Sequence, residues 1–168
     1  MAETGHVVGA VAVTGGVAAV DVASLAGSSL PIRISIPTGE TAVLPLSDRQ
    51  LAAATVDDEP GVFDNAFGFG VETVDGKPKP TLARLASWTN EIKLDGTRLT
   101  VTVPLENTSR AAKVIALVAE GQTVHLLVGE IPVNEKTVSL PVTVDTGEHG
   151  VLVLVEGWAG RLDSVSRS

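Results

Sequence analysis

Between residues 92 and 155, short runs of valine, leucine and isoleucine alternate with clusters of turn-forming residues, and this pattern most limits how the chain can fold. Leu99 and Val101 alternate with threonines, which is the period of a strand buried on one face. The pair Asp95 and Gly96 precedes that run and is a strong hairpin signal. Strands at this spacing are typical of an all-β sandwich or small barrel.

We expect three hairpins in this part of the chain, because each pair of apolar runs is separated by a short polar turn. The turns lie at residues 95–96, 120–122 and 145–150. The strands are residues 92–94 and 99–105, residues 113–119 and 123–128, and residues 137–144 and 151–155.

The composition indicates what fills the core. Apolar residues make up 44% of the 168 residues, but aromatic residues only 3%, and tyrosine is absent. The core must therefore consist of valine, leucine, isoleucine and alanine, which suit packed sheets. A chain of this length can bury roughly 70% of its unfolded surface, enough for one domain with an N-terminal elaboration.

The first half of the chain also contains strand patterns. Residues 7–13 and 17–22 are valine- and alanine-rich runs around Gly15 and Gly16, and we expect them to form a hairpin. Isoleucines alternate with polar residues over 32–36, and a turn leads to a second strand over 41–46. The N-terminal part is thus expected to be β-rich as well.

One short helix is predicted after these strands. Ser47 and Gln50 have the spacing of a capping box, and flanking leucines could form a hydrophobic staple, so a helix is expected over residues 48–54. Residues 63–74 are glycine-rich and expected to be extended. Residues 81–88 fit either a strand or a second short helix.

The segments LTVTVPLENTS and KTVSLPVTVDTGEHGVLVLVEG resemble the immunoglobulin-like β-sandwich modules of phage virion and bacterial surface proteins. The resemblance implies an immunoglobulin-like sandwich over residues 90–168, with residues 1–89 as a β-rich elaboration. It implies no catalytic role, because such modules serve many binding functions. The residues that carry it are Asn107, Thr108 and Ser109 after an early strand, and Gly147, Gly150 and residues 151–155 near the end.

Charge and cysteine content exclude several classes of function. The net charge is −8, the isoelectric point is about 4.8, and no cluster of lysines or arginines occurs, which argues against nucleic-acid binding. The chain has no cysteine, so disulfides and cysteine-ligated metals are excluded.

The sequence offers little catalytic chemistry, and we expect no catalytic residue, no metal and no cofactor. His6, His125 and His149 are the only histidines, and none has a second ligand at metal-binding spacing. His125 lies within an apolar strand and is expected to be an ordinary strand residue with a satisfied partner. The acidic residues 57–59 lack the ligand spacing of a calcium loop. No Gly-x-Ser-x-Gly elbow occurs, which lowers the odds of a hydrolase.

All three phenylalanines fall within one seven-residue window, Phe63, Phe67 and Phe69. They could plug the core, or they could anchor a neighbouring subunit, because aromatic anchors dominate interface energetics. The candidate interface residues are Phe63, Phe67, Phe69, Val7, Val11, Trp88 and Trp158.

These observations favour a non-enzymatic structural protein of a large assembly, a bacteriophage tail or capsid component. Its expected partners are other virion proteins and further copies of itself, with neither nucleic acid nor membrane insertion. The apolar residues 7–25 lack a preceding basic residue and are interrupted by glycines, so we expect no signal peptide or transmembrane segment, and synthesis in the host cytoplasm before incorporation into the virion. The alternative is a carbohydrate- or cell-surface-binding β-sandwich module.

Overall fold

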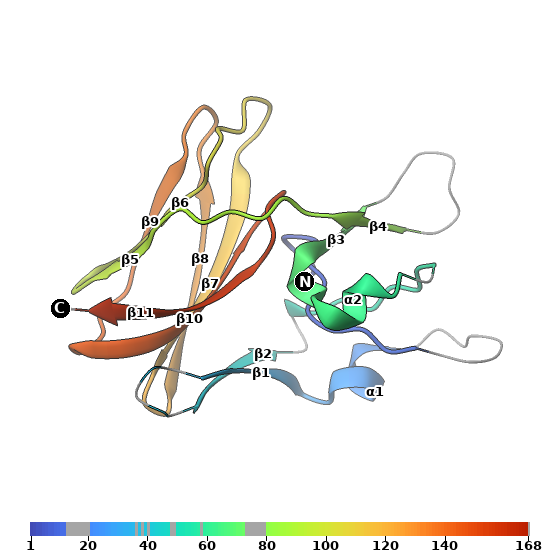
Figure 1. Ribbon diagram of the computed structural model, residues 1–168, viewed down its shortest axis with the longest axis horizontal. Coiled ribbons are helices and arrows are strands. Elements are labelled where there is room, and N and C mark those ends of the chain that lie inside the picture. The colour runs from blue at the N-terminus through green and yellow to red at the C-terminus, as the bar shows by residue number, and fades with distance from the viewer. Residues whose placement is uncertain are drawn as a thin grey trace.

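The computed structural model describes residues 1–12, 21–35, 37, 39, 41–47, 50–57, 59–72 and 80–167 (Figure 1). The described chain is mostly antiparallel β-sheet, as the sequence predicts, and its two short helices lie where none was predicted. No helix among these residues is long and apolar enough to cross a membrane.

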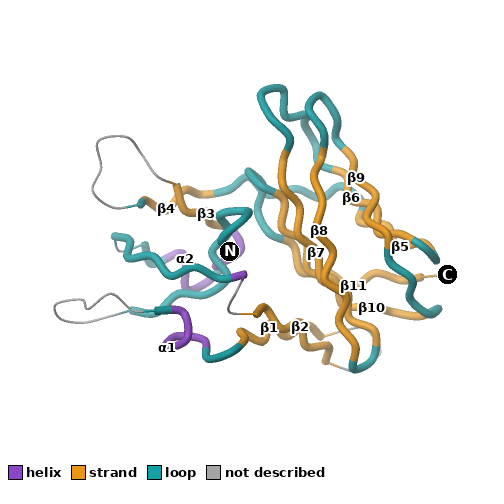
Figure 2. Tube along the Cα trace, turned by 180° about the vertical axis from the view of Figure 1, so that it is seen from behind, coloured by secondary structure: helices purple, strands orange, loops and turns teal. Residues whose placement is uncertain are grey.

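Two antiparallel sheets form the C-terminal half of the protein (Figures 1 and 2). One has three strands in the order β5-β6-β9, and the other has four in the order β11-β10-β7-β8. Their strands are β5 (Ile92–Asp95), β6 (Arg98–Thr102), β7 (Ala112–Glu120), β8 (Thr123–Ile131), β9 (Thr137–Pro141), β10 (Gly147–Val155) and β11 (Arg161–Arg167).

The two sheets share one hydrophobic cluster, which we call the inner core. Alternate residues of each strand point into it, as the period of a strand requires: Val151 and Val153 of β10 pack there with Leu99 of β6. The inner core comprises Trp88, Ile92, Leu94, Leu99, Val101, Val103, Ala112, Val114, Ala116, Val118, Ile131, Leu140, Val142, Val144, Val151, Val153, Val155 and Val165.

A second cluster, the outer core, lies on the opposite face of the four-stranded sheet. There the hairpin of β1 (Ser29–Ser35) and β2 (Thr41–Ser47) packs against β7 and β10. Because β7 and β10 are covered on both faces, their sequences are almost continuously apolar. The outer core comprises Met1, Ile34, Leu44, Leu46, Ile115, Leu117, Ala119, Leu152 and Leu154.

The remaining elements lie together on one side of the molecule, beside the two sheets (Figures 1 and 2). The N-terminal segment runs alongside β3, where the amide of Val7 donates to the carbonyl of Phe69 at 3.0 Å. These elements are α1 (Val22–Ala26), α2 (Gly61–Asp64), the 3-10 turn η2 (Ala66–Gly68), β3 (Phe69–Glu72) and β4 (Thr81–Arg84).

Three predicted hairpins are confirmed: β1 with β2, β5 with β6, and β7 with β8. The predicted pairing of residues 137–144 with 151–155 is wrong. β9 pairs with β6, whereas β10 pairs with β7 and β11, so the connection between β9 and β10 crosses from one sheet to the other. Alternation identifies a strand but does not specify its partner.

The predicted N-terminal hairpin is also wrong over its described residues. Residues 7–12 form no strand, and Val22 begins α1, because the carboxylate of Asp21 accepts from the amide of Ser24 at 2.9 Å and caps the helix. Residues 13–20 lie outside the described part of the chain.

The helix predicted over 48–54 is wrong at residues 51–54, which lie in no regular element; residues 48 and 49 lie outside the described part. The capping contact exists, since the amide of Ser47 donates to Oε1 of Gln50 at 2.9 Å. However, the carbonyl of Gln50 accepts from the amide of Ala2 at 3.0 Å, so a tertiary contact uses the acceptor that a helix would need.

Two further segments differ from expectation. Residues 63–74 are extended only from Phe69 onward, because Phe63 lies in α2 and Ala66–Gly68 form η2; residues 73–74 are outside the described part. Residues 81–84 form the strand β4, so the first half of the segment 81–88 is a strand and not a helix. The domain boundary at residue 89 stays a prediction, and residues on both sides of it form the outer core.

Candidate interaction surface

The three phenylalanines do not act together. Phe69 is buried at the start of β3, and Phe67 is partly buried and packs against the outer core. Phe63, on α2, is 53% exposed. Two members of the window therefore fill the fold, as a core plug would, and one points to solvent.

The tryptophans pack inward. Trp88 is 5% exposed, its indole N–H donates to the carbonyl of Ala159 at 2.8 Å, and the guanidinium of Arg161 lies 4.6 Å from its ring centre. Trp158 is partly buried and packs against the inner core. Neither ring forms the flat exposed platform that sugar binding would use.

Val7 and Val11 line an apolar hollow of about 530 Å³ beside the N-terminal segment. Val7 is partly buried, whereas Val11 is exposed. The walls are mostly small apolar residues from residues 1–11 and 52–56, and no pair of convergent charged groups lies among them. Among its described lining residues, no set of polar groups converges on a position where a ligand would be selected.

His6 is a structural residue. It is 1% exposed, and its Nε2 donates to the carbonyl of Trp158 at 2.7 Å, which leaves Nδ1 to accept from the hydroxyl of Thr4 at 2.9 Å. Burial lowers the pKa of His6 to about 4. A neutral imidazole thus ties the N-terminal segment to the turn between β10 and β11.

His125 and His149 flank the connection between β9 and β10. Nε2 of His125 lies 3.0 Å from Glu120, so it is a partnered strand residue as expected. The other oxygen of Glu120 accepts from the amide of Asp145 at 2.5 Å. The hydrogen bond from His125, followed by that from Asp145, lowers the pKa of Glu120.

His149 completes this arrangement. It is buried, with its two ring nitrogens each 2.9 Å from a carbonyl oxygen, those of Ala119 and Asp145. The histidines and carboxylates here hold the crossing between the sheets in place. Among the described residues, no group of three or more His, Asp or Glu side chains could hold a metal ion.

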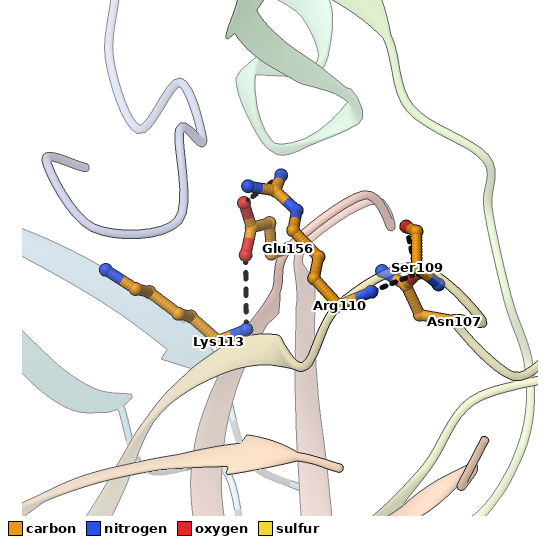
Figure 3. Close-up of polar contacts among 5 residues, drawn as sticks. All are labelled: Asn107, Ser109, Arg110, Lys113 and Glu156. Atoms are coloured by element: carbon orange, nitrogen blue, oxygen red, sulfur yellow. Dashed lines mark hydrogen bonds and ion pairs between the residues drawn. The ribbon is translucent and has the colours of Figure 1, made fainter. Parts of the chain in front are cut away.

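A further polar cluster closes the loop between β6 and β7 (Figure 3). Arg110 donates to Glu156 at 2.6 Å, and the second carboxylate oxygen of Glu156 accepts from the amide of Lys113 at 3.3 Å. Asn107 accepts from the amide and hydroxyl of Ser109 at 3.1 and 2.9 Å. These polar groups are hydrogen-bonded to one another, so the cluster holds the loop between β6 and β7 in place.

An exposed apolar row on β8 was missed by the sequence reasoning. Leu126 and Val128 are 49% and 59% exposed and lie opposite Leu117 and Ile115 of β7, which are 2% exposed. The signal was the unbroken run Leu126–Leu127–Val128, because consecutive apolar residues in a strand point to both faces of its sheet.

We compared the chain with protein-family models, curated protein sequences and solved structures, and none of them matched.

Proposed function

We propose that this protein is a non-enzymatic structural component of a large assembly, a bacteriophage tail or capsid protein that acts through contacts between subunits. The observation that carries the proposal is the exposed apolar row on β8. This row extends the buried outer face of the four-stranded sheet into a part that no other segment covers in the described chain. Exposed apolar rows next to a core are typical of protein–protein contact sites.

We also propose that residues 90–168 are an immunoglobulin-like sandwich. Counted from β5, the first, second and fifth strands form one sheet, and the fourth, third, sixth and seventh form the other. Two antiparallel sheets connected in this crossing manner around an alternating core support that assignment. A sandwich of this kind is a rigid scaffold whose edges and loops are free to make contacts.

The carbohydrate-binding alternative has less support, because Trp88 is buried and Trp158 packs against the inner core. Of the five aromatic residues, Phe63 is the one with an exposed side chain. A single exposed phenylalanine is a poor stacking surface for a sugar.

The test is to find the protein within particles. Phage particles from the source of the sequence are purified by density gradient, and their proteins are quantified by mass spectrometry. We expect this chain at a constant copy number per particle, co-sedimenting with the other virion proteins. Recovery of the chain entirely in the free protein fraction would overturn the proposal.

A further inference from the structure

The sheet edges differ in how well they are protected against pairing with another chain. β1 and β2 contain Pro31 and Pro45, β9 ends in Pro141, and β5 is four residues long and carries Lys93 and Asp95. Prolines, charges and shortness are the usual protections of an edge strand.

β8 has less protection than these four edges. It is nine residues long, contains no proline, and pairs with β7 along one side only. The other edge of the same sheet, β11, carries Arg161, Asp163 and Arg167. On the inner side β8 lies close to β9 of the other sheet, since Leu140 fills the space in front of Gly129. An added strand would therefore meet β8 along its backbone edge and outer face.

The outer face of β8 is also incompletely covered. Val124, Leu126 and Val128 share this face with Leu117 and Ile115 of the outer core, because residues opposite in the β7–β8 register lie on the same side. The β1–β2 hairpin buries the residues of β7 but leaves Leu126 and Val128 open. An added strand beside β8 would extend the apolar surface at this point.

We infer that β8 pairs with β8 of a second copy of this chain, antiparallel across a two-fold axis perpendicular to the sheet. This inference rests on the proposed function and names one of its contacts. A two-fold axis in this direction keeps the outer faces of both copies on the same side of the joined sheet. Even-numbered residues of β8 can therefore lie opposite only even-numbered residues of the second copy, and odd-numbered residues opposite odd-numbered ones.

One register fits the side chains of β8. Centred on Leu127, it places Leu126 opposite Val128 of the second copy, and the symmetry repeats that apolar pair. It also places Glu130 opposite Val124, and His125 opposite Gly129, in front of which the side chain of Leu140 of β9 lies. The strand is thus complementary to itself where it is most exposed.

Charges permit this register. The two copies of Glu130 would lie six residues apart along the seam, roughly 20 Å, which exceeds the Debye length of about 8–10 Å at physiological salt. Lys113 also lies opposite Glu130 in the register of the same copy. The net charge of −8 repels two copies at long range, so added salt should strengthen the association.

A single strand pair buries less than the roughly 1,200 Å² of a stable interface, so we expect a dissociation constant of about 0.1–1 mM. Sedimentation equilibrium of the purified protein at about 1 mM should show dimers, more of them at higher salt. Leu126→Lys and Val128→Lys should each weaken association about tenfold or more. The matched control is Val43→Lys, an exposed valine on β2 outside the proposed contact.

A strictly monomeric protein at this concentration would overturn the inference, and so would dimers that persist in both lysine variants. Thermal melts check that the variants fold. A monomeric chain that is nevertheless present in purified particles would refute the β8 contact and leave the proposed function standing. Dimers of a chain that is absent from particles would support the β8 contact and refute the proposed function.

A cysteine test fixes the register and does not depend on the lysine variants. The chain has no cysteine, so Leu126→Cys and Val128→Cys introduce the sole thiols. Residues directly opposite have Cα atoms about 4.5–5.5 Å apart, within disulfide range. A mixture of the two variants should therefore oxidise to the mixed dimer faster than either variant alone. Equal rates in all three samples would refute the register centred on Leu127.

Discussion

Gly150 of β10 lies directly against Ile34 of β1: a Cβ atom on Gly150 would stand 2.6 Å from Cγ2 of Ile34 and 2.9 Å from Cβ of Ala42. The hairpin of β1 and β2 therefore rests on the four-stranded sheet at a position where only glycine fits. This contact joins the first half of the chain to the second and makes the outer core a shared structure.

Gly150→Ala should destabilise the protein by about 1–3 kcal/mol, because the added methyl would overlap the side chains of Ile34 and Ala42. The measurement is urea denaturation followed by circular dichroism. Gly9→Ala is the control, since its Cβ would meet Leu30 at an ordinary 3.7 Å. Equal unfolding free energies for the two variants would mean that the hairpin does not sit on Gly150.

His6 should make the protein sensitive to mild acid. Its pKa is lowered from 6.5 to about 4, so the folded state favours the neutral ring. The stability it contributes is complete above pH 6.5 and declines as the pH falls toward 4, by a loss on the order of 3 kcal/mol. Unfolding free energies measured at pH 7 and at pH 4.5 check this.

His6→Gln removes the titrating group and serves as the comparison for that measurement. The variant is expected to be less stable than the natural protein at pH 7, because a buried hydrogen bond to Trp158 is altered. Its stability should fall less between pH 7 and 4.5 than that of the natural protein. Parallel pH profiles for the two proteins would show that His6 is not the group responsible.

Glu120→Gln should loosen the crossing between β9 and β10. The carboxylate accepts from Asp145 and contacts His125, and an amide cannot accept at both positions with charge assistance. We expect faster amide hydrogen exchange at Asp145 in the variant. Glu130→Gln, on the exposed face of β8, should leave that exchange unchanged. In the natural protein the protection of the same amide, measured against its intrinsic exchange rate at each pH, should fall as Glu120 becomes protonated at acid pH.

Trp88→Phe should reduce stability by about 1–2 kcal/mol, because the carbonyl of Ala159 loses its buried donor while the aromatic ring remains. Denaturation followed by circular dichroism measures the loss. In the companion variant Trp158→Phe, Trp88 is the sole tryptophan, and its fluorescence should be blue-shifted as expected of a buried indole. Emission typical of a water-exposed indole would contradict its placement in the inner core.

The sequence by itself determined the strands that pair through a short turn. Asp95 and Gly96 join β5 to β6, and the turn after Glu120 joins β7 to β8, because partners adjacent in the chain need only the right turn residues and alternation. β11 was not expected, since its residues are mostly polar and only Val165 among them is buried. An edge strand with a polar sequence gives no clear alternation.

Tertiary structure alone decided the non-local partners and the surface. β9 and β10 have equally clear strand patterns, yet each pairs within a different sheet, because alternation determines the face of a strand and not its neighbour. Leu117 and Leu126 are both leucines on the outer face, but one is covered by the β1–β2 hairpin and the other is not. Burial depends on which distant segment packs over a residue, and the local sequence carries no record of that segment.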